Sequence, residues 1–252
     1  MPSCTFNSQF TTNFEQSQAK TSETNKNSSD FTVVYVHGLC SDPWGRKPEE
    51  VKRFCEENNI SFFRFELAGH GADRENYEKV DFNTWKGQIL EVVDKMVVGK
   101  ILFIGSSLGG WLSLIAARER PERTKGVIGL APAPDFTYDM ERYVLTDAQK
   151  TEMKESGRLL YPTKDFTYVV TQKMFDTARN NLLLEAPLAI TCPVHIIHGT
   201  EDKNLDPQKP FKLLKCLQSE DVVLKLIKGS NHSLGRDADI EELLNSIRSF
   251  MD

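Results

Sequence analysis

The chain has 252 residues, of which 39% are hydrophobic, and carries a formal net charge of -5 at pH 7. This length and hydrophobic content allow one large α/β domain with an insertion. The acidic balance argues against a nucleic-acid or anionic-membrane surface, because either would need a concentrated basic patch. No apolar run approaches the roughly 20 residues of a membrane span, so we expect no membrane-spanning segment.

The cysteines predict a reducing compartment. Cys4, Cys40, Cys55, Cys192 and Cys216 are scattered along the chain and form no C-x-x-C pair. An odd number at irregular spacing suits neither a disulfide framework nor a zinc site. Disulfides persist in oxidising compartments, so we expect this protein in the cytoplasm.

The first thirty residues differ from the rest of the chain, because Ser, Thr, Asn and Gln dominate them. Phe6, Phe10 and Phe14 stand among these polar residues. The segment has neither the apolar core of a signal peptide nor the arginines of a transit peptide, so we expect no targeting signal. Two interpretations stay open for residues 1–30: a polar tail, or a short edge strand built on the three phenylalanines.

Six short apolar runs rich in β-branched and aromatic residues predict strands, and stretches with a 3.6-residue hydrophobic period separate them. Residues 82–96 and 240–247 are two such helical stretches. Mostly apolar strands suit a parallel sheet covered on both faces. The alternation therefore predicts an α/β fold whose doubly wound, mostly parallel sheet is formed by residues 31–135 and 191–252. The predicted strands are residues 31–36, 61–65, 100–104, 126–130, 194–197 and 222–227.

The alternation stops at residues 136–190, where the pattern predicts helices and no core strand. The longest helical stretches cover residues 147–160 and 165–184. We interpret residues 136–190 as a helical cap inserted between two strands of the sheet. Its large apolar side chains either line an acyl pocket or pack the cap onto itself and the core. They are Met140, Tyr143, Met153, Tyr161, Tyr168, Met174 and Phe175.

Residues 105–109 read Gly-Ser-Ser-Leu-Gly, a G-x-S-x-G motif between a predicted strand and a predicted helix. This context is typical of a nucleophile elbow, a sharp turn that lifts a serine hydroxyl above the sheet. Gly105 and Gly109 stand two residues before and two residues after Ser107, where side chains would collide in such a turn. Ser106 lacks this spacing, so Ser107 is the candidate nucleophile.

A serine nucleophile needs a histidine to take its proton and a carboxylate to orient that histidine. In a fold of this kind the acid, and then the histidine, follow the serine along the chain. His232 lies in the loop after the last strand, whereas His195 lies within a strand and His198 at its end. We therefore predict His232 as the base and expect packing or turn roles for the other two.

Three carboxylates follow the fifth predicted strand: Glu201, Asp202 and Asp206. Asp206 precedes a proline that opens a predicted helix at residues 211–217, which is typical of an N-cap residue. We interpret Glu201 as a solvent-exposed loop charge. Asp202 is therefore the predicted acid, and it would accept the Nδ1 hydrogen of His232.

An oxyanion hole must accompany the nucleophile, and one donor is normally the N–H of the following residue, here Leu108. The second donor comes from the loop after the first parallel strand, which begins His37-Gly38-Leu39. Gly38 lets this loop turn close to the elbow, and the N–H of Leu39 is the predicted donor. We interpret His37 and His70 as structural residues that hold turns. Each oxyanion donor typically contributes about 3 kcal/mol to the transition state.

Several motifs together carry a family resemblance. They are His37-Gly38, Gly69-His70-Gly71, G-S-S-L-G-G-W-L at residues 105–112, His198-Gly199 with Asp202, and Asn231-His232. From about residue 31 to the C-terminus, the chain resembles the α/β-hydrolase superfamily. Within it, the chain is similar to the group of acyl-protein thioesterases and esterases around abhydrolase-domain-containing protein ten and its bacterial relatives. The further segments on which this similarity to the group rests are Ser41-Asp42, Gly45-Arg46-Lys47, Asn181-Leu182-Leu183-Leu184 and Cys192-Pro193-Val194.

The resemblance implies a serine hydrolase with a helical cap, in which Ser107, Asp202 and His232 form a catalytic triad. It implies hydrolysis of acyl thioesters or carboxylic esters. Members of this group usually have Val-Pro three residues after the acid, whereas this chain has Leu-Asp-Pro at residues 205–207. That difference keeps Asp206 as the alternative acid.

The expected reaction is a two-step acyl transfer to water that needs no metal and no organic cofactor. The expected substrate is a small-molecule acyl ester or thioester, with an acylated protein as a further candidate. A peptidase, a lactonase and a carbon–carbon bond hydrolase on the same fold are alternatives. A non-catalytic hydrolase-fold binding protein is another, although such proteins usually lack a triad member and here every role has a candidate.

Overall fold

The computed structural model describes residues 2–6, 10–19, 30–163 and 167–251. Its main feature is an eight-stranded sheet in the order β1-β2-β4-β3-β5-β6-β9-β10. The six strands from β4 to β10 in this order run parallel, whereas β1 and β2 are antiparallel at one edge. The predicted doubly wound, mostly parallel sheet is therefore confirmed. The strands are β1 (Ser3–Phe6), β2 (Phe10–Ser17), β3 (Phe31–Val36), β4 (Ser61–Phe65), β5 (Lys100–Ser106), β6 (Thr124–Leu130), β9 (Val194–Gly199) and β10 (Val222–Ile227).

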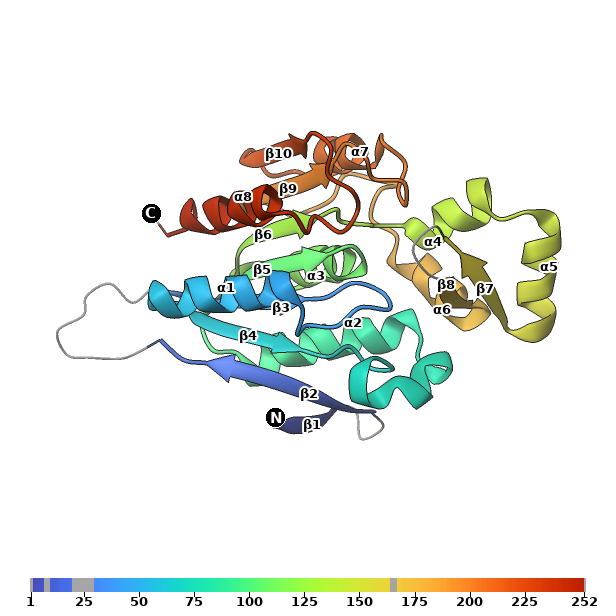
Figure 1. Ribbon diagram of the computed structural model, residues 1–252, viewed down its shortest axis with the longest axis horizontal. Coiled ribbons are helices and arrows are strands. Elements are labelled where there is room, and N and C mark those ends of the chain that lie inside the picture. The colour runs from blue at the N-terminus through green and yellow to red at the C-terminus, as the bar shows by residue number, and fades with distance from the viewer. Residues whose placement is uncertain (1, 7–9, 20–29, 164–166, 252) are drawn as a thin grey trace.

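Helices cover both faces of the sheet (Figure 1). Because side chains alternate along a strand, Val33 and Tyr35 of β3 pack towards α1 and α8, and Val34 and Val36 pack towards α2, α3 and α7. Each face therefore has its own apolar cluster, and together the two clusters bury the parallel strands. The covering helices are α1 (Arg46–Glu57), α2 (Phe82–Glu91), α3 (Leu108–Glu119), α7 (Lys209–Cys216) and α8 (Asp237–Arg248).

The N-terminal residues that the structure describes form edge strands. The ring of Phe14 in β2 stacks on Phe63 of β4 with 5.6 Å between ring centroids. Glu15 of β2 forms an ion pair with the buried Arg64 of β4, and Arg64 Nε donates to Glu15 Oε2 at 2.8 Å. The edge-strand interpretation applies to β1 and β2, whereas residues 1, 7–9 and 20–29 lie outside the described part.

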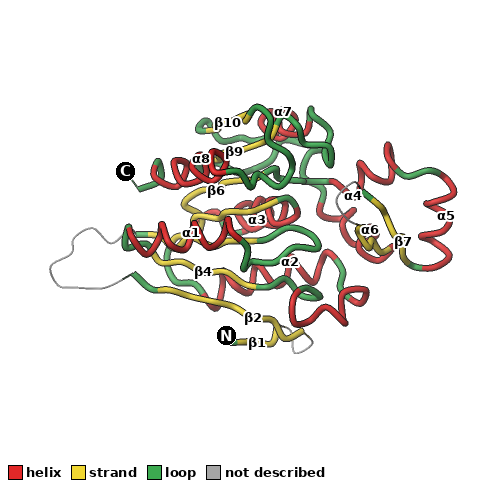
Figure 2. Tube along the Cα trace, viewed as in Figure 1, coloured by secondary structure: helices red, strands yellow, loops and turns green. Residues whose placement is uncertain are grey.

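Residues 136–190, the cap segment, contain a hairpin that the sequence did not predict. The strands β7 and β8 pair antiparallel, so the stretch expected to be helical from residue 165 begins as a strand. Its Thr-Tyr-Val-Val-Thr run is β-branched and aromatic, which favours a strand over a helix. The segment lies beyond the carboxyl ends of the central strands (Figures 1 and 2). Its elements are α4 (Phe136–Asp139), η4 (Met140–Val144), α5 (Asp147–Ser156), β7 (Arg158–Pro162), β8 (Thr167–Thr171), α6 (Gln172–Ala178) and η5 (Arg179–Asn181).

Three shorter elements complete the described chain: η1 (Gly71–Lys79), η2 (Val92–Met96) and η3 (Pro121–Arg123). Among the described helices, none combines the length and the apolar character that crossing a membrane requires. Cys40, Cys55, Cys192 and Cys216 carry free thiols.

Candidate active site

Ser107 lies at the sharp turn between β5 and α3, with backbone angles of φ 52° and ψ -113°. A positive φ is strained for a residue with a side chain, at a cost of about 1–3 kcal/mol. The backbone around it is packed closely, because a Cβ on Gly105 would lie 2.4 Å from the carbonyl oxygen of Gly109. A Cβ on Gly109 would lie 2.1 Å from the carbonyl oxygen of Val36. The two glycines of the motif are therefore required by close approach.

The imidazole of His232 lies between the serine hydroxyl and a carboxylate. Its Nε2 is 3.0 Å from Ser107 Oγ, and its Nδ1 is 2.8 Å from Asp202 Oδ2. Because an ionised carboxylate only accepts hydrogen bonds, Nδ1 carries the proton and Nε2 can accept the serine hydrogen. Ser107 follows β5. Asp202 lies in the loop after β9, residues 200–208, which we call the acid loop, and His232 lies in the loop after β10, residues 228–236, which we call the histidine loop. They meet at the carboxyl edge of the sheet, where open α/β sheets bind ligands.

Asp202 is held by hydrogen bonds on both carboxylate oxygens. Oδ1 accepts from the N–H groups of Asn204 at 2.8 Å and Leu205 at 3.3 Å, while Oδ2 faces His232. Burial by itself would raise the pKa of this carboxyl, but the hydrogen bond from His232 and the other attractive contacts outweigh burial. The pKa of Asp202 therefore lies below its ordinary value, and the carboxylate is ionised at neutral pH.

The acid loop and the histidine loop are joined to each other. The N–H of Glu201 donates to the carbonyl oxygen of Ser230 at 2.8 Å. The N–H of Gly229 donates to Thr200 Oγ1 at 2.9 Å. Because each loop bonds to the other, the distance between the carboxylate and the imidazole depends on both strands together.

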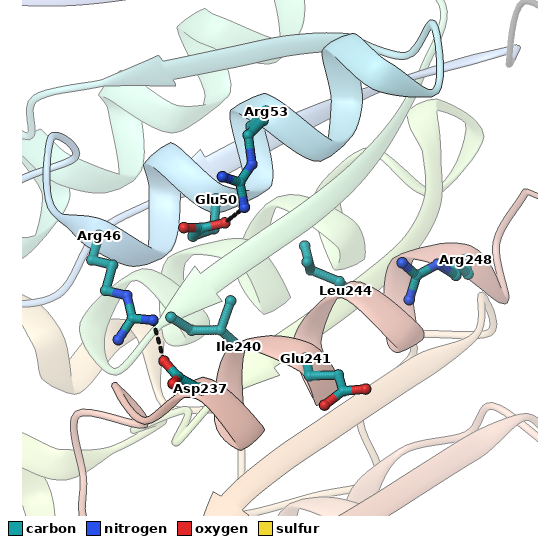
Figure 3. Close-up of a pocket in the computed structure, with 8 residues that line it drawn as sticks. All are labelled: Arg46, Glu50, Arg53, Asp237, Ile240, Glu241, Leu244 and Arg248. Atoms are coloured by element: carbon teal, nitrogen blue, oxygen red, sulfur yellow. Dashed lines mark hydrogen bonds and ion pairs between the residues drawn. The ribbon is translucent and has the colours of Figure 1, made fainter.

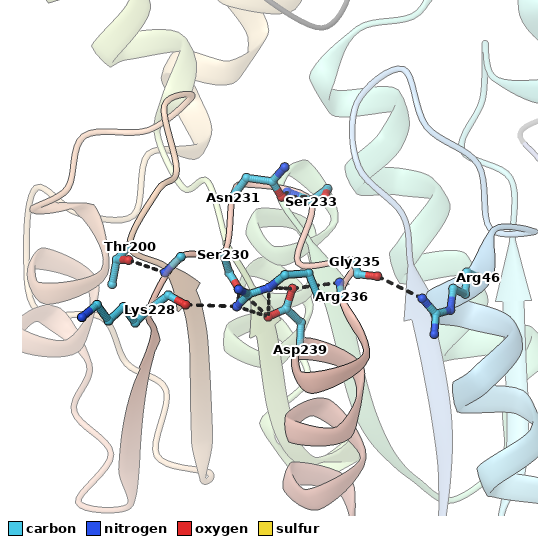
Figure 4. A network of polar contacts seen from close by, with 10 residues as sticks. Arg46, Thr200, Lys228, Ser230, Asn231, Ser233, Gly235, Arg236 and Asp239 are labelled. Atoms are coloured by element: carbon cyan, nitrogen blue, oxygen red, sulfur yellow. Dashed lines mark hydrogen bonds and ion pairs between the residues drawn. The ribbon is translucent and has the colours of Figure 1, made fainter.

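A polar network around the buried Asp239 braces the histidine loop (Figure 4). The guanidinium of Arg236 donates to Ser230 Oγ and, at 3.0 Å, to Asp239 Oδ1, and the N–H of Arg236 donates to Asp239 Oδ2 at 3.0 Å. Arg46 of α1 donates to the carbonyl oxygen of Gly235 at 3.4 Å from the other side. The loop is thus fixed at its start, through Ser230, and at its end, through Gly235 and Arg236.

The two predicted oxyanion donors flank the elbow. The N–H of Leu108 belongs to the first turn of α3, where N–H groups have no carbonyl partner within the helix. Leu39 follows Gly38, and a Cβ on Gly38 would lie 3.3 Å from Ser107 Cβ, so this loop lies against the serine. An oxyanion formed beside Ser107 would also lie near the positive end of the α3 dipole.

Two buried histidines hold the loop that carries Leu39. His37 Nδ1 donates to the carbonyl oxygen of Gly38 at 2.8 Å, and His37 Nε2 accepts from the N–H of Leu67 at 2.9 Å. His70 Nε2 accepts from the N–H of Cys40 at 3.0 Å. Burial lowers the pKa of both imidazoles, so both are neutral at pH 7 and act as hydrogen-bonding groups.

The alternative acid, Asp206, is exposed and takes part in a local turn. Its Oδ1 accepts from the N–H of Gln208 at 2.8 Å, which helps to start α7 at Lys209. Glu201 is also exposed. Among the described residues, the carboxylate that bonds to His232 belongs to Asp202, and not to Asp206 or Glu201.

The large apolar side chains of the cap segment differ in burial. Tyr143 is 74% exposed, so it lines no acyl pocket in this conformation. The others belong to the cluster on the α2–α3 face of the sheet or pack against it, and the cluster therefore spans the cap segment and the core. These residues are Met140, Met153, Tyr161, Tyr168, Met174 and Phe175.

Sequence reasoning missed two side chains beside this site. His198 Nε2 lies 3.3 Å from Asp202 Oδ2, and the spacing of four residues across a glycine turn was the available signal. Asp135 accepts hydrogen bonds from the N–H groups of Leu183 and Leu184, each at 2.8 Å, and joins the two ends of the cap segment. No sequence pattern pairs Asp135 with residues so far along the chain.

A surface hollow of about 260 Å³ lies between α1 and α8 (Figure 3). Its charged lining is largely self-paired, because Arg46 bonds to Asp237 and Arg53 bonds to Glu50. Its lining includes none of the residues that surround Ser107. We therefore do not place the substrate there.

Comparison with known proteins identifies the family. Residues 75–252 match the sequence profile of the prolyl oligopeptidase family. The mitochondrial palmitoyl-protein thioesterase ABHD10 of Rattus norvegicus is 30% identical over 223 residues, which cover 87% of this chain and 75% of that relative. The chain belongs to the prolyl oligopeptidase family of α/β-hydrolases. The predicted superfamily and its thioesterase group are thereby confirmed.

Other hydrolases of this superfamily are similar over nearly the whole chain. The structure of mouse α/β-hydrolase domain-containing protein 10 superposes with a TM-score of 0.88 at 26% identity, covering 100% of this chain and 98% of the other. Monoglyceride lipase of Mus musculus is 23% identical over 85% of this chain and 79% of that relative. This α/β-hydrolase is therefore an enzyme related to a thioesterase and to a lipase.

Proposed function

We propose that this hydrolase cleaves acyl thioesters or carboxylic esters through a triad of Ser107, His232 and Asp202. One observation carries the proposal: a single imidazole lies 3.0 Å from a strained serine hydroxyl and 2.8 Å from a buried carboxylate. A serine hydroxyl that can pass its proton to an oriented neutral imidazole is an acyl-transfer nucleophile.

In the first step, Ser107 Oγ attacks the acyl carbonyl carbon while His232 Nε2 takes its proton. Asp202 accepts the Nδ1 hydrogen and stabilises the imidazolium that forms. The N–H groups of Leu39 and Leu108 donate to the carbonyl oxygen as it becomes an anion, and each such donor contributes about 3 kcal/mol. The imidazolium then protonates the departing thiol or alcohol, which leaves an acyl-enzyme on Ser107.

In the second step, water attacks the acyl-enzyme while His232 Nε2 takes one of its protons. The same two N–H groups hold the second oxyanion, and the imidazolium returns its proton to Ser107 Oγ as the acid product leaves. The proposed steps use no metal and no organic cofactor, because the protons pass between Ser107, His232, the leaving group and water.

We propose thioesters as the first substrate class to test, including those of acylated proteins. The similarity to a palmitoyl-protein thioesterase supports this choice, and the similarity to a monoglyceride lipase supports carboxylic esters as the second class. Partly buried apolar side chains of the cap segment, such as Met140, Tyr161 and Tyr168, are candidates for contact with the acyl chain.

The nucleophile is tested by replacing Ser107 with alanine. We expect turnover of a p-nitrophenyl ester to fall at least about 10⁴-fold, because the acyl-enzyme can no longer form. Labelling by a fluorophosphonate probe should disappear with it. Labelling that persists on another serine would overturn the assignment.

The acid is tested by comparing Asp202→Asn with Asp206→Asn. We expect Asp202→Asn to lower kcat by about 10³–10⁴-fold, because the asparagine favours the wrong tautomer of His232. Asp206→Asn keeps an acceptor for the N–H of Gln208 and should leave activity close to that of the wild type. The opposite ranking would make Asp206 the acid.

The substrate class is tested with a panel of compounds in which esters and thioesters are matched in acyl group at each chain length. Acyl p-nitrophenyl esters, acyl thioesters, lactones and aminoacyl amides of increasing chain length separate the esterase, lactonase and peptidase alternatives. We expect the highest kcat/KM for a thioester. Cleavage of amides alone would make the enzyme a peptidase, and binding without cleavage would make it a non-catalytic member of the fold.

We propose the cytoplasm as the compartment, because the described cysteines are free thiols. The ABHD10 relatives are named as mitochondrial proteins, so the two compartments are the alternatives. Fractionation of cells that express the full chain distinguishes them, and enrichment in mitochondria would overturn the proposal.

A further inference from the structure

Asp202 Oδ2 has a second imidazole beside it. His198 Nε2 lies 3.3 Å from this oxygen, while His232 Nδ1 lies 2.8 Å from it. The side chains of His198 and Asp202 are only 4% and 2% exposed. His198 is the next-to-last residue of β9, and the N–H of Asp202 donates to the carbonyl oxygen of Gly199 at 3.2 Å. This turn folds the acid back onto the end of its own strand.

The surroundings of His198 determine which of its nitrogens carries the proton. Nδ1 is buried and has no hydrogen-bond partner among the described residues. A proton on Nδ1 would leave a buried N–H without an acceptor and would point the Nε2 lone pair at a carboxylate oxygen. A proton on Nε2 instead faces an ionised carboxylate oxygen at 3.3 Å, which is an attractive contact.

Burial lowers the pKa of His198, and the titratable groups that act on it are Asp202 and His232. The ring is therefore neutral at pH 7. It offers Asp202 an N–H dipole and no net charge, so it offsets only a small part of the carboxylate charge that acts on the imidazolium.

We infer that His198 is a positioning residue for the acid: its Nε2–H holds Asp202 Oδ2 in the orientation that faces His232 Nδ1. This inference rests on the proposed function, because it assigns a role to a neighbour of the proposed triad. With it, each carboxylate oxygen has polar partners besides the catalytic imidazole: Oδ1 accepts from the N–H groups of residues 204 and 205, and Oδ2 has His198 Nε2 at 3.3 Å.

The test compares His198→Phe, His198→Gln and His195→Phe. Phenylalanine keeps the shape of the ring without the donor, and glutamine places an amide N–H near the position of Nε2. His195→Phe is the matched control, because His195 is buried on the same strand but packs against Phe250 on the opposite face, with 5.0 Å between ring centroids. Far-UV circular dichroism and denaturant unfolding confirm that each variant is folded.

We expect His198→Phe to lower kcat/KM for a p-nitrophenyl ester about tenfold, because the polar contact of Nε2 with the charged carboxylate is lost. The acid limb of the pH profile should move about half a unit to higher pH, since the whole carboxylate charge then acts on the catalytic imidazole. His198→Gln should recover most of the activity, and His195→Phe should leave the pH profile unchanged. Equal profiles for the two phenylalanine variants would overturn the inference.

Two further measurements separate this inference from the proposed function. In the Asp202→Asn background, His198→Phe should cause no additional loss, because the partner of its N–H is already altered. ¹⁵N NMR of the unmodified enzyme should show His198 as the neutral Nε2–H tautomer. A proton on Nδ1 overturns the role of His198 even if the triad is correct, whereas an active Asp202→Asn enzyme overturns the triad itself.

Discussion

Ser107 is held in an uncommon backbone conformation by close packing and by its own backbone hydrogen bonds, among them the one that its N–H donates to the carbonyl oxygen of Leu130 at 2.9 Å. Its φ of 52° is compensated by packing, because α3 approaches β3 to the point where Gly109 has no room for a side chain. Catalytic geometry and stability therefore depend on the same close contact.

Gly109→Ala should destabilise the protein by about 3 kcal/mol and remove activity, because its Cβ would lie 2.1 Å from the carbonyl oxygen of Val36. Gly45→Ala is the matched control, since a Cβ there meets nothing within 4 Å. Denaturant unfolding and ester hydrolysis measure both variants. Similar losses of stability and activity in the two variants would show that the close approach of α3 to β3 does not determine either property.

His37, which holds the loop that carries Leu39, should make the free energy of unfolding sensitive to acid. Burial, and next the neighbouring His70, lower the pKa of His37 from 6.5 to about 3. As the pH falls below about 6.5, the unfolded chain binds a proton that the folded chain does not bind, so the free energy of unfolding decreases. This contribution is present above pH 6.5 and is lost progressively down to about pH 3, at up to about 1.4 kcal/mol per pH unit.

His37→Gln should reduce this slope, because glutamine does not titrate. The free energy of unfolding of both proteins is measured in urea at several pH values from 4 to 7.5. Parallel curves for the variant and the wild type would show that another group causes the acid sensitivity.

At the scale of elements, the buried strands were the easiest feature to predict. The strands β3, β4, β5, β6 and β9 are short, largely buried apolar runs, and β10 at the sheet edge is a partly buried one. These apolar runs were enough to locate all six parallel strands. The hairpin β7–β8 was missed because it is partly exposed and its residues continue directly into α6. The sequence left two interpretations for the residues of β1 and β2, because polar residues are as compatible with an edge strand as with a polar tail.

The residues of the candidate site could likewise be predicted only in part from the sequence. Ser107, Asp202 and His232 could be selected because each directly follows a strand, and parallel strands bring such positions together. The contact of His198 with Asp202 depends on a turn, and that of Asp135 with residues 183–184 depends on tertiary packing. The four-residue spacing of His198 and Asp202 is too common in sequences to distinguish the first contact from chance, and no spacing indicates the second.

One hydroxyl contributes to holding the hairpin on the core. Tyr77 Oη donates to the carbonyl oxygen of Val169 in β8 at 2.8 Å. Tyr77→Phe should lower the free energy of unfolding by about 1 kcal/mol and speed amide exchange in β7 and β8 above that elsewhere. Tyr143→Phe is the control, because that side chain is 74% exposed. Unchanged exchange in β7 and β8 would show that other contacts hold the hairpin.

At the scale of the whole molecule, the cap segment and the sheet share one apolar cluster. Met174 and Phe175 of α6 belong to the same cluster as Trp111 of α3, whose Nε1 donates to the carbonyl oxygen of Asn181 at 3.1 Å. A shared core predicts cooperative loss of both parts.

We therefore expect a single unfolding transition. A variant with Trp44→Phe and Trp85→Phe keeps Trp111 as its one tryptophan, which reports on the contact with the cap segment. Its fluorescence and its far-UV circular dichroism should change at the same denaturant concentration. A fluorescence change that precedes the loss of helix would mean that the cap segment separates before the sheet unfolds.

The position of Asp135 has a consequence for engineering. Asp135 lies just after β6, where the chain leaves the sheet, and its carboxylate accepts from the N–H groups of Leu183 and Leu184 on the returning side. The segment between Asp135 and Leu183 therefore begins and ends at neighbouring positions. Replacing it with a loop or lid of different length should leave the strand order of the sheet unchanged. Chimeras joined at this junction would acquire new selectivity while keeping the parental reaction chemistry.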